Sequence, residues 1–123
     1  MIVTSLLYRE AKYLNWEIEY TDHFFKWWCT LDEDEKISVD ASIHLLEHFG
    51  PQLRFPHSSN IENSKVNHMR ELRIQHKGTP YRVLYAFDPR RTALLLIGGN
   101  KRGNKNWYKT VSYTHLTLPT ILL

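Results

Sequence analysis

Two runs of alternating residues, joined by a glycine-containing turn, constrain the fold of this chain more than any other feature. In residues 69–75 and 81–87, apolar and polar side chains alternate with a period of two, which is typical of β-strands with two unlike faces. Between them, His76-Lys-Gly-Thr-Pro80 is typical of a turn, because Gly78 accepts a positive φ angle. We therefore expect an antiparallel hairpin.

The polar face of this hairpin carries an unusual pair of charges. If the turn spans residues 76–79, Arg73 lies opposite Arg82, and Glu71 is a diagonal neighbour of Arg82. Like charges directly opposite one another destabilise a sheet by up to about 1 kcal/mol. A domain that keeps such a pair usually holds an anion there, and guanidinium groups suit phosphate geometry and stay charged. The alternative is an ordinary solvated face with a Glu–Arg pair, and a one-residue slip would change the pairing.

A further strand and a basic loop follow the hairpin. Asp88-Pro-Arg-Arg91 predicts a turn, and residues 92–97 are nearly all apolar, as in a strand covered on both sides. Residues 100–109 interleave cations with aromatic rings, namely Lys101, Lys105, Trp107 and Tyr108. Such a mixture suits single-stranded RNA, because cations hold the backbone and rings stack on bases. The alternative is an ordinary basic surface loop whose tryptophan fills the core.

The N-terminal half predicts one strand and two helices. Residues 16–20 alternate like a strand, and Thr21 is placed to cap a short helix. Asp32 and Glu35 form a capping-box pattern for a longer helix that ends at Gly50. Residues 51–67 have the composition of a loop. We expect an α+β fold, in which an N-terminal strand and a helical hairpin pack on an antiparallel sheet.

Composition limits the classes of function. The 123 residues suffice for one domain, and the net charge of +3 with a pI near 9.0 permits nucleic-acid binding. Acidic residues concentrate in 21–50, whereas the segment from Lys65 to Lys109 is basic, which predicts one basic surface that includes Lys65 and Arg70. The lone Cys29 excludes an internal disulfide and fits a reducing cytosol. No apolar run approaches the roughly 20 residues of a membrane span.

The histidines do not define a site by themselves. His44 and His48 have the spacing of a zinc-binding helix, but no cysteine cluster completes a site, so we expect no metal. His57 and His76 are chemically eligible general bases, and nothing in the sequence ranks them.

The order of elements and several motifs resemble a known family. The motifs are Asn67-His-Met-Arg-Glu-Leu-Arg-Ile-Gln, Tyr81-Arg-Val-Leu-Tyr-Ala-Phe-Asp-Pro-Arg-Arg, Leu96-Ile-Gly-Gly-Asn-Lys101 and Asn106-Trp-Tyr108. They resemble the phage-derived HigB-like toxins of the RelE/ParE superfamily, from Trp16 to about Lys109. The resemblance implies a RelE-like fold and a toxin of a type II toxin–antitoxin pair that cleaves mRNA on the ribosome without metal or cofactor. It also implies a helix-turn-helix, HigA-like antitoxin as partner, and action in the cytoplasm.

The resemblance also implies roles for individual residues. By position, Arg73 and Arg82 supply positive charge to the reacting phosphate, and Glu71 either holds an arginine or acts as a base. Tyr108 stacks on a base or assists proton transfer. The remaining cations are expected to contact RNA, namely Lys65, Arg70, Lys101 and Lys105. A second function stays open, because some ParE relatives inhibit gyrase through protein contacts and cleave no RNA.

The two ends of the chain depart from the family pattern. Family members usually continue past the Trp-Tyr motif into a C-terminal helix, whereas residues 110–123 are uncharged apart from a histidine and resemble translated adaptor sequence. We therefore expect residues 1–15 to be an N-terminal extension, 16–109 the toxin domain and 110–123 a non-native tail. Such a copy is truncated, which puts its activity in question.

Overall fold

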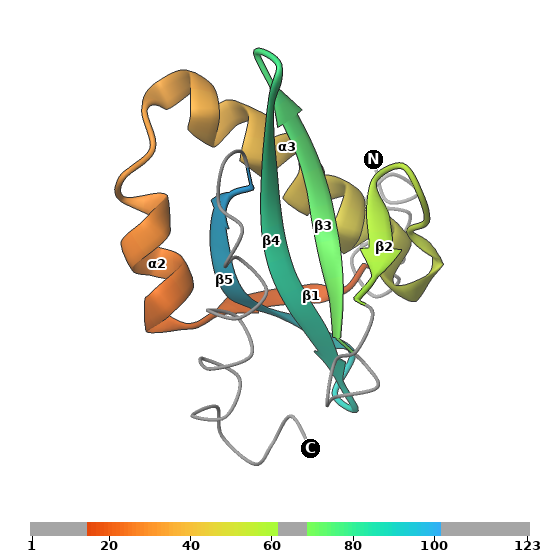
Figure 1. The fold of residues 1–123 in the computed structure, drawn as a ribbon. Helices are drawn as coiled ribbons and strands as arrows, with labels where there is room; N and C mark the ends of the chain where they lie inside the picture. The colour runs from red at the N-terminus through yellow and green to blue at the C-terminus, as the bar shows by residue number, and fades with distance from the viewer. Residues whose placement is uncertain (1–14, 62–68, 102–123) are drawn as a thin grey trace, which may run out of the picture.

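The computed structural model describes residues 15–61 and 69–101. In chain order they form β1 (Glu17–Tyr20), α2 (Asp22–Trp28), α3 (Glu33–Phe49), the short 3-10 helix η1 (Gly50–Gln52), β2 (Ser58–Asn60), β3 (Met69–His76), β4 (Thr79–Asp88) and β5 (Thr92–Asn100). The strands make one sheet in the order β1-β5-β4-β3-β2 (Figure 1). The predicted domain boundaries at residues 15 and 109 stay predictions.

The two helices begin where the sequence places their caps. The Thr21 hydroxyl accepts a hydrogen bond from the Phe24 backbone N–H at 3.1 Å and donates one to the Leu96 carbonyl at 2.5 Å, which ties the start of α2 to β5. At α3, Asp32 and Glu35 form the reciprocal capping box, with bonds of 2.8 and 2.9 Å. Gly50 then ends α3 with a φ angle of +55°. The Thr21 and Asp32 caps satisfy backbone N–H groups that the helices leave without a partner.

The central hairpin has the predicted register, but the sheet is mixed rather than purely antiparallel. In β3 and β4, Arg73 pairs with Arg82 and Leu72 with Val83, which confirms the predicted alignment. β1 instead runs parallel to β5, with Glu17 opposite Thr92. A period-two pattern predicts a strand and its faces but carries no information on the direction of its neighbour.

A short strand also forms inside the segment predicted to be loop. β2 pairs antiparallel with β3, so that Ser59 lies opposite Glu71. Its sequence, Ser-Ser-Asn, lacks the β-branched and aromatic residues that strands favour. Tertiary pairing with β3 therefore overrides its local propensity.

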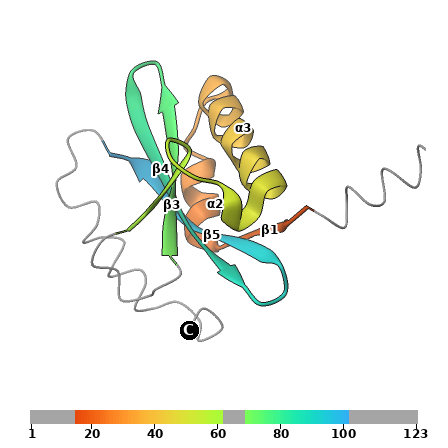
Figure 2. The same cartoon turned by 90° about the vertical axis from the view of Figure 1, so that its right-hand side faces the viewer.

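The sheet has an apolar core on each face. Both helices lie on the same side of it (Figure 2), where they bury Phe24, Val39 and Leu46 against the strands. A smaller cluster on the other face consists of Met69, Leu84, Ala86 and Leu96. β5 contributes to both clusters, which confirms that this strand is covered on both sides. Within residues 15–61 and 69–101, no helix is long and apolar enough to cross a membrane.

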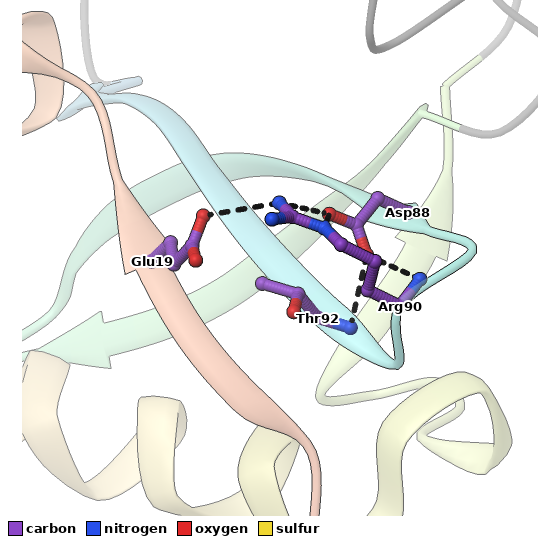
Figure 3. A network of polar contacts seen from close by, with 4 residues as sticks. All are labelled: Glu19, Asp88, Arg90 and Thr92. Carbon is purple, nitrogen blue, oxygen red and sulfur yellow. Dashed lines mark hydrogen bonds and ion pairs between the residues drawn. The ribbon is translucent and has the colours of Figure 1, made fainter.

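The turn between β4 and β5 is fixed by one carboxylate. Asp88 accepts hydrogen bonds from the backbone N–H groups of Arg90, at 2.8 Å, and Thr92, at 3.2 Å, and from the Arg90 guanidinium at 2.7 and 3.0 Å (Figure 3). Arg90 also lies 3.6 Å from Glu19 on β1. Burial alone would raise the pKa of Asp88, but the hydrogen bonds and charge of Arg90 outweigh it and lower that pKa.

Candidate functional site

The charged residues of the hairpin lie on the face of the sheet opposite the two helices. Successive side chains of a strand point to opposite faces. Because Leu72 and Val83 belong to the core beneath the helices, Glu71, Arg73 and Arg82 point the other way. The chain thus brings together three of the four residues predicted to be catalytic.

Glu71 lies between the two arginines. Its Oε1 atom is 3.7 Å from Nη1 of Arg73 and 3.7 Å from Nε of Arg82, and it accepts a hydrogen bond from the Ser59 hydroxyl at 3.0 Å. The Arg82 Nη1 group also donates to the Tyr81 carbonyl at 2.9 Å. The diagonal contact between Glu71 and Arg82 therefore follows from the predicted register.

Two guanidinium groups around one carboxylate give the cluster of Glu71, Arg73 and Arg82 a net positive charge. The Glu71 and Arg82 side chains are nearly buried, with exposed fractions of 4% and 8%, whereas 28% of the Arg73 side chain is exposed. Buried charges are costly unless they are paired, and Glu71 lies within ion-pair distance of both arginines. The arrangement can bind an anion from the Arg73 side, with Arg82 as a preorganised charge behind it.

Two residues near the arginines were not predicted to belong to the site. Ser59 contacts Glu71, and the Phe55 ring lies beneath the Arg73 guanidinium, with 4.9 Å between the Arg73 Cζ atom and the ring centroid. The backbone N–H of Arg73 also donates to the His57 carbonyl at 2.8 Å. Phe55, His57 and Ser59 all belong to the segment predicted to be a loop. That this segment borders the site follows from the pairing of β2 with β3.

Arg70 is not brought together with the other arginines. It lies one residue before Glu71 and shares the helix-side face with Leu72. Residues two apart in a strand point to the same face, so this placement follows from the sequence spacing. Its guanidinium donates to the Ser58 hydroxyl at 3.0 Å, to the Asn60 side chain and to the Leu53 carbonyl at 3.5 Å. These contacts hold β2 against β3.

Of the four remaining predicted site residues, the structure describes only Lys101, a predicted RNA contact. Lys101 follows β5 directly, and its backbone N–H donates to the Pro80 carbonyl at 2.9 Å. It therefore lies at the same end of the sheet as Arg82, which pairs with Gly99. Tyr108, Lys65 and Lys105 lie outside the described residues.

A second polar cluster lies on the helix side, at the start of α3. The Tyr81 hydroxyl donates to the Glu35 carboxylate, and this hydrogen bond, together with burial and the negative charge, raises the pKa of Tyr81 to about 12. The Nδ1 atom of His76 is 2.7 Å from the Ser38 hydroxyl, and its ring stacks on Tyr81. The cluster joins the hairpin turn to α3, away from the arginine face. In the part of the chain that the structure describes, no three His, Cys, Asp or Glu side chains are grouped so that they could hold a metal ion.

Comparison with known proteins identifies the family of this chain. The family described as phage derived protein Gp49-like matches residues 26–113. The chain belongs to this family. A Mycobacterium tuberculosis protein named "Putative toxin HigB3" is 45% identical over 84 residues, which cover 68% of this chain and 72% of that protein. Another, named "Putative toxin HigB2", is 39% identical over 84 residues, which cover 67% of this chain and 42% of that protein.

Solved structures show the same fold at low sequence identity. An arginine-to-alanine double mutant of the Escherichia coli toxin RelE, in the free state, superposes with a TM-score of 0.59 and 11% identity, covering 80% of this chain and 97% of that one. The intact Escherichia coli RelBE toxin–antitoxin complex matches with a TM-score of 0.51 and 9% identity, over 68% of this chain and 94% of that one. The predicted likeness to HigB-like proteins and the RelE-like α+β fold are confirmed.

Proposed function

We propose that this Gp49-like protein is the toxin of a type II toxin–antitoxin pair and cleaves mRNA on the ribosome. The names of its relatives, HigB2 and HigB3, and the RelE-like fold support a toxin. The observation that carries the ribonuclease proposal is the arrangement of Arg73 and Arg82 around Glu71 on the face opposite the helices. It is an anion site of the kind that phosphate chemistry needs.

The reaction would proceed without a metal. The 2′-hydroxyl of one nucleotide loses its proton to a general base and attacks the adjacent phosphorus. The bond from phosphorus to the 5′-oxygen of the next nucleotide breaks, and a general acid or water gives that oxygen a proton. The products are a 2′,3′-cyclic phosphate and a 5′-hydroxyl. Negative charge builds on the phosphoryl oxygens in the transition state, where preorganised cations lower the barrier. Arg73 and Arg82 supply these cations.

The remaining predicted residues act around this centre. Glu71 orients the two guanidinium groups or takes the proton, and Tyr108 stacks on a base or transfers a proton. Lys65, Lys101 and Lys105 contact the RNA backbone. Arg70 acts indirectly, because its bonds to Ser58 and Asn60 hold β2, and with it Ser59, beside Glu71.

The protein would be held inactive by an antitoxin. The fold is shared with a toxin that has been solved in complex with its antitoxin, RelBE. We infer a partner of the helix-turn-helix, HigA-like kind, and action in the cytoplasm, where ribosomes and mRNA are found.

The test is the rate of mRNA cleavage in a translating extract that contains the full chain. Arg73→Ala and Arg82→Ala should each slow cleavage about 100-fold or more, the usual loss when one preorganised charge-stabilising group is removed. Arg73→Lys and Arg82→Lys keep the charge but lose the guanidinium fork, so they should retain part of the rate. Lys26→Ala removes an exposed cation from α2, on the helix side, and should change nothing.

Thermal melting of each variant separates loss of chemistry from loss of folding, which matters most for the nearly buried Arg82. Cleavage that persists at the wild-type rate in folded Arg73→Ala and Arg82→Ala variants contradicts the proposal. Growth arrest with intact mRNA would instead favour a ParE-like toxin that acts on gyrase by protein contacts.

A further inference from the structure

The Phe55 ring is exposed to solvent and at the same time contacts a charged residue of the site. Its exposed fraction is 71%, the largest among the big hydrophobic residues that the structure describes as exposed. The Arg73 guanidinium lies over the ring at 4.9 Å from its centroid. A cation over an exposed ring contributes only about 0.5–1 kcal/mol, so this contact does little to offset the exposure of so large an apolar surface.

Other exposed aromatic rings are placed differently. Tyr20 and Phe25 stack on each other at 6.0 Å, and Tyr20 belongs to β1, at the opposite edge of the sheet from β2. Phe49, at the end of α3, packs edge-on against the His48 ring at 4.7 Å. Of the exposed aromatic residues in the ranges 15–61 and 69–101, Phe55 is the one that contacts the arginine face.

The chain on both sides of Phe55 is anchored. Leu53 is 4% exposed, and its carbonyl accepts from the Arg70 guanidinium at 3.5 Å. Two residues after Phe55, the His57 carbonyl accepts from the backbone N–H of Arg73 at 2.8 Å. The ring is therefore held beside Arg73 by the fold and does not depend on the guanidinium contact alone.

We propose that Phe55 is a stacking subsite for a nucleobase of the single-stranded RNA whose phosphate binds at Arg73. An aromatic ring has two faces, and the guanidinium occupies one of them. A base that stacks on the other face completes a base–ring–guanidinium stack. Phosphate and base are parts of the same nucleotide strand, so one ligand can contact both Arg73 and Phe55. This inference rests on the proposed ribonuclease function and adds a residue that positions the strand.

The test measures binding of the full chain to ribosomes that carry an mRNA made uncleavable by 2′-O-methyl groups. Phe55→Leu keeps the apolar volume but removes the stacking ring, and should weaken binding about 5- to 100-fold. Phe55→Tyr keeps the ring and should bind like wild type. Phe49→Leu, an exposed phenylalanine away from the site, is the matched control and should also bind like wild type.

An abasic nucleotide, scanned along the mRNA, identifies the stacked base. At one position the abasic nucleotide should weaken binding of the wild-type protein by the same factor as the Phe55→Leu substitution does. The same abasic mRNA should not weaken binding of the Phe55→Leu protein any further. The subsite is overturned if Phe55→Leu binds like wild type, or if the abasic nucleotide weakens binding of both proteins equally. In that case, cleavage of mRNA by the wild-type protein still upholds the proposed function. A wild-type protein that neither binds nor cleaves mRNA overturns both.

Discussion

At the scale of single residues, Glu71 determines how two arginines can face each other across a hairpin. Its Oε1 atom lies 3.7 Å from one nitrogen of each guanidinium group, and its side chain is 4% exposed. Its charge weakens the repulsion between Arg73 and Arg82 at a site where water screens that repulsion poorly. We therefore expect the carboxylate to stabilise the fold and to hold the two cations at the proposed phosphate site.

Replacement of this carboxylate should destabilise the protein measurably. We expect Glu71→Gln to lower the free energy of unfolding by about 2–3 kcal/mol, because it removes the charge of a nearly buried carboxylate that lies 3.7 Å from each of two arginines. Glu19→Gln is the matched control, since Glu19 pairs with Arg90 at 3.6 Å but is 53% exposed, and its loss should cost less than about 1 kcal/mol. Urea unfolding measures both values. Equal losses in the two variants would contradict the role given to Glu71.

Tyr81 should make stability fall at high pH. Its pKa is raised from 10.0 to about 12 in the folded protein, because the protonated hydroxyl donates to Glu35. The contribution of this bond is therefore complete below pH 10 and is lost as the pH rises from 10 through about 12. The difference in unfolding free energy between wild type and Tyr81→Phe should be constant below pH 10 and shrink above it. A difference that stays constant to pH 12 would show that Tyr81 does not titrate as described.

At the scale of elements, the hairpin was predictable because its pattern and its turn agree. A one-residue slip would turn the apolar face of one strand away from the core, and the turn at 76–79 selects the register that pairs Arg73 with Arg82. The placement of Arg70 on the helix side could have been derived from the same alternation. By contrast, the parallel direction of β1 and the strand at Ser58–Asn60 depend on partners far away in sequence. The position of Phe55 beside Arg73 was unpredictable for that reason.

The contact between α2 and β5 depends on a glycine. A Cβ atom at Gly98 would lie 2.1 Å from the Trp27 ring, which is closer than real contacts allow. We expect Gly98→Ala to lower the free energy of unfolding by about 1–3 kcal/mol, because the ring or the helix must shift. In a Trp27→Leu background, Gly98→Ala should lower the free energy of unfolding clearly less. Urea unfolding of wild type, the two single variants and the double variant gives the coupling energy between the two positions. Equal costs in both backgrounds would show that the two residues do not meet.

At the scale of the whole molecule, the two faces of the sheet differ in what covers them. One face carries both helices and most of the apolar core (Figure 2). The other carries Glu71, Arg73 and Arg82 beside a smaller apolar cluster, and within the described residues no helix covers it. The two strands of the hairpin contain no glycine, and Arg70 holds the edge strand β2 beside them, which favours the preorganised charge that our proposed mechanism requires.

In the proposed mechanism, this face promotes attack of an RNA 2′-hydroxyl on the neighbouring phosphate. The most direct measurement maps the ends of mRNA fragments formed in a translating extract, with a second mRNA that carries a single 2′-deoxynucleotide at the cleavage position. We predict fragments with 5′-hydroxyl and 2′,3′-cyclic phosphate ends, which disappear with the 2′-deoxynucleotide and in the Arg73→Ala variant. Fragments with 5′-phosphate ends, or cleavage that continues at the 2′-deoxynucleotide, would contradict the account.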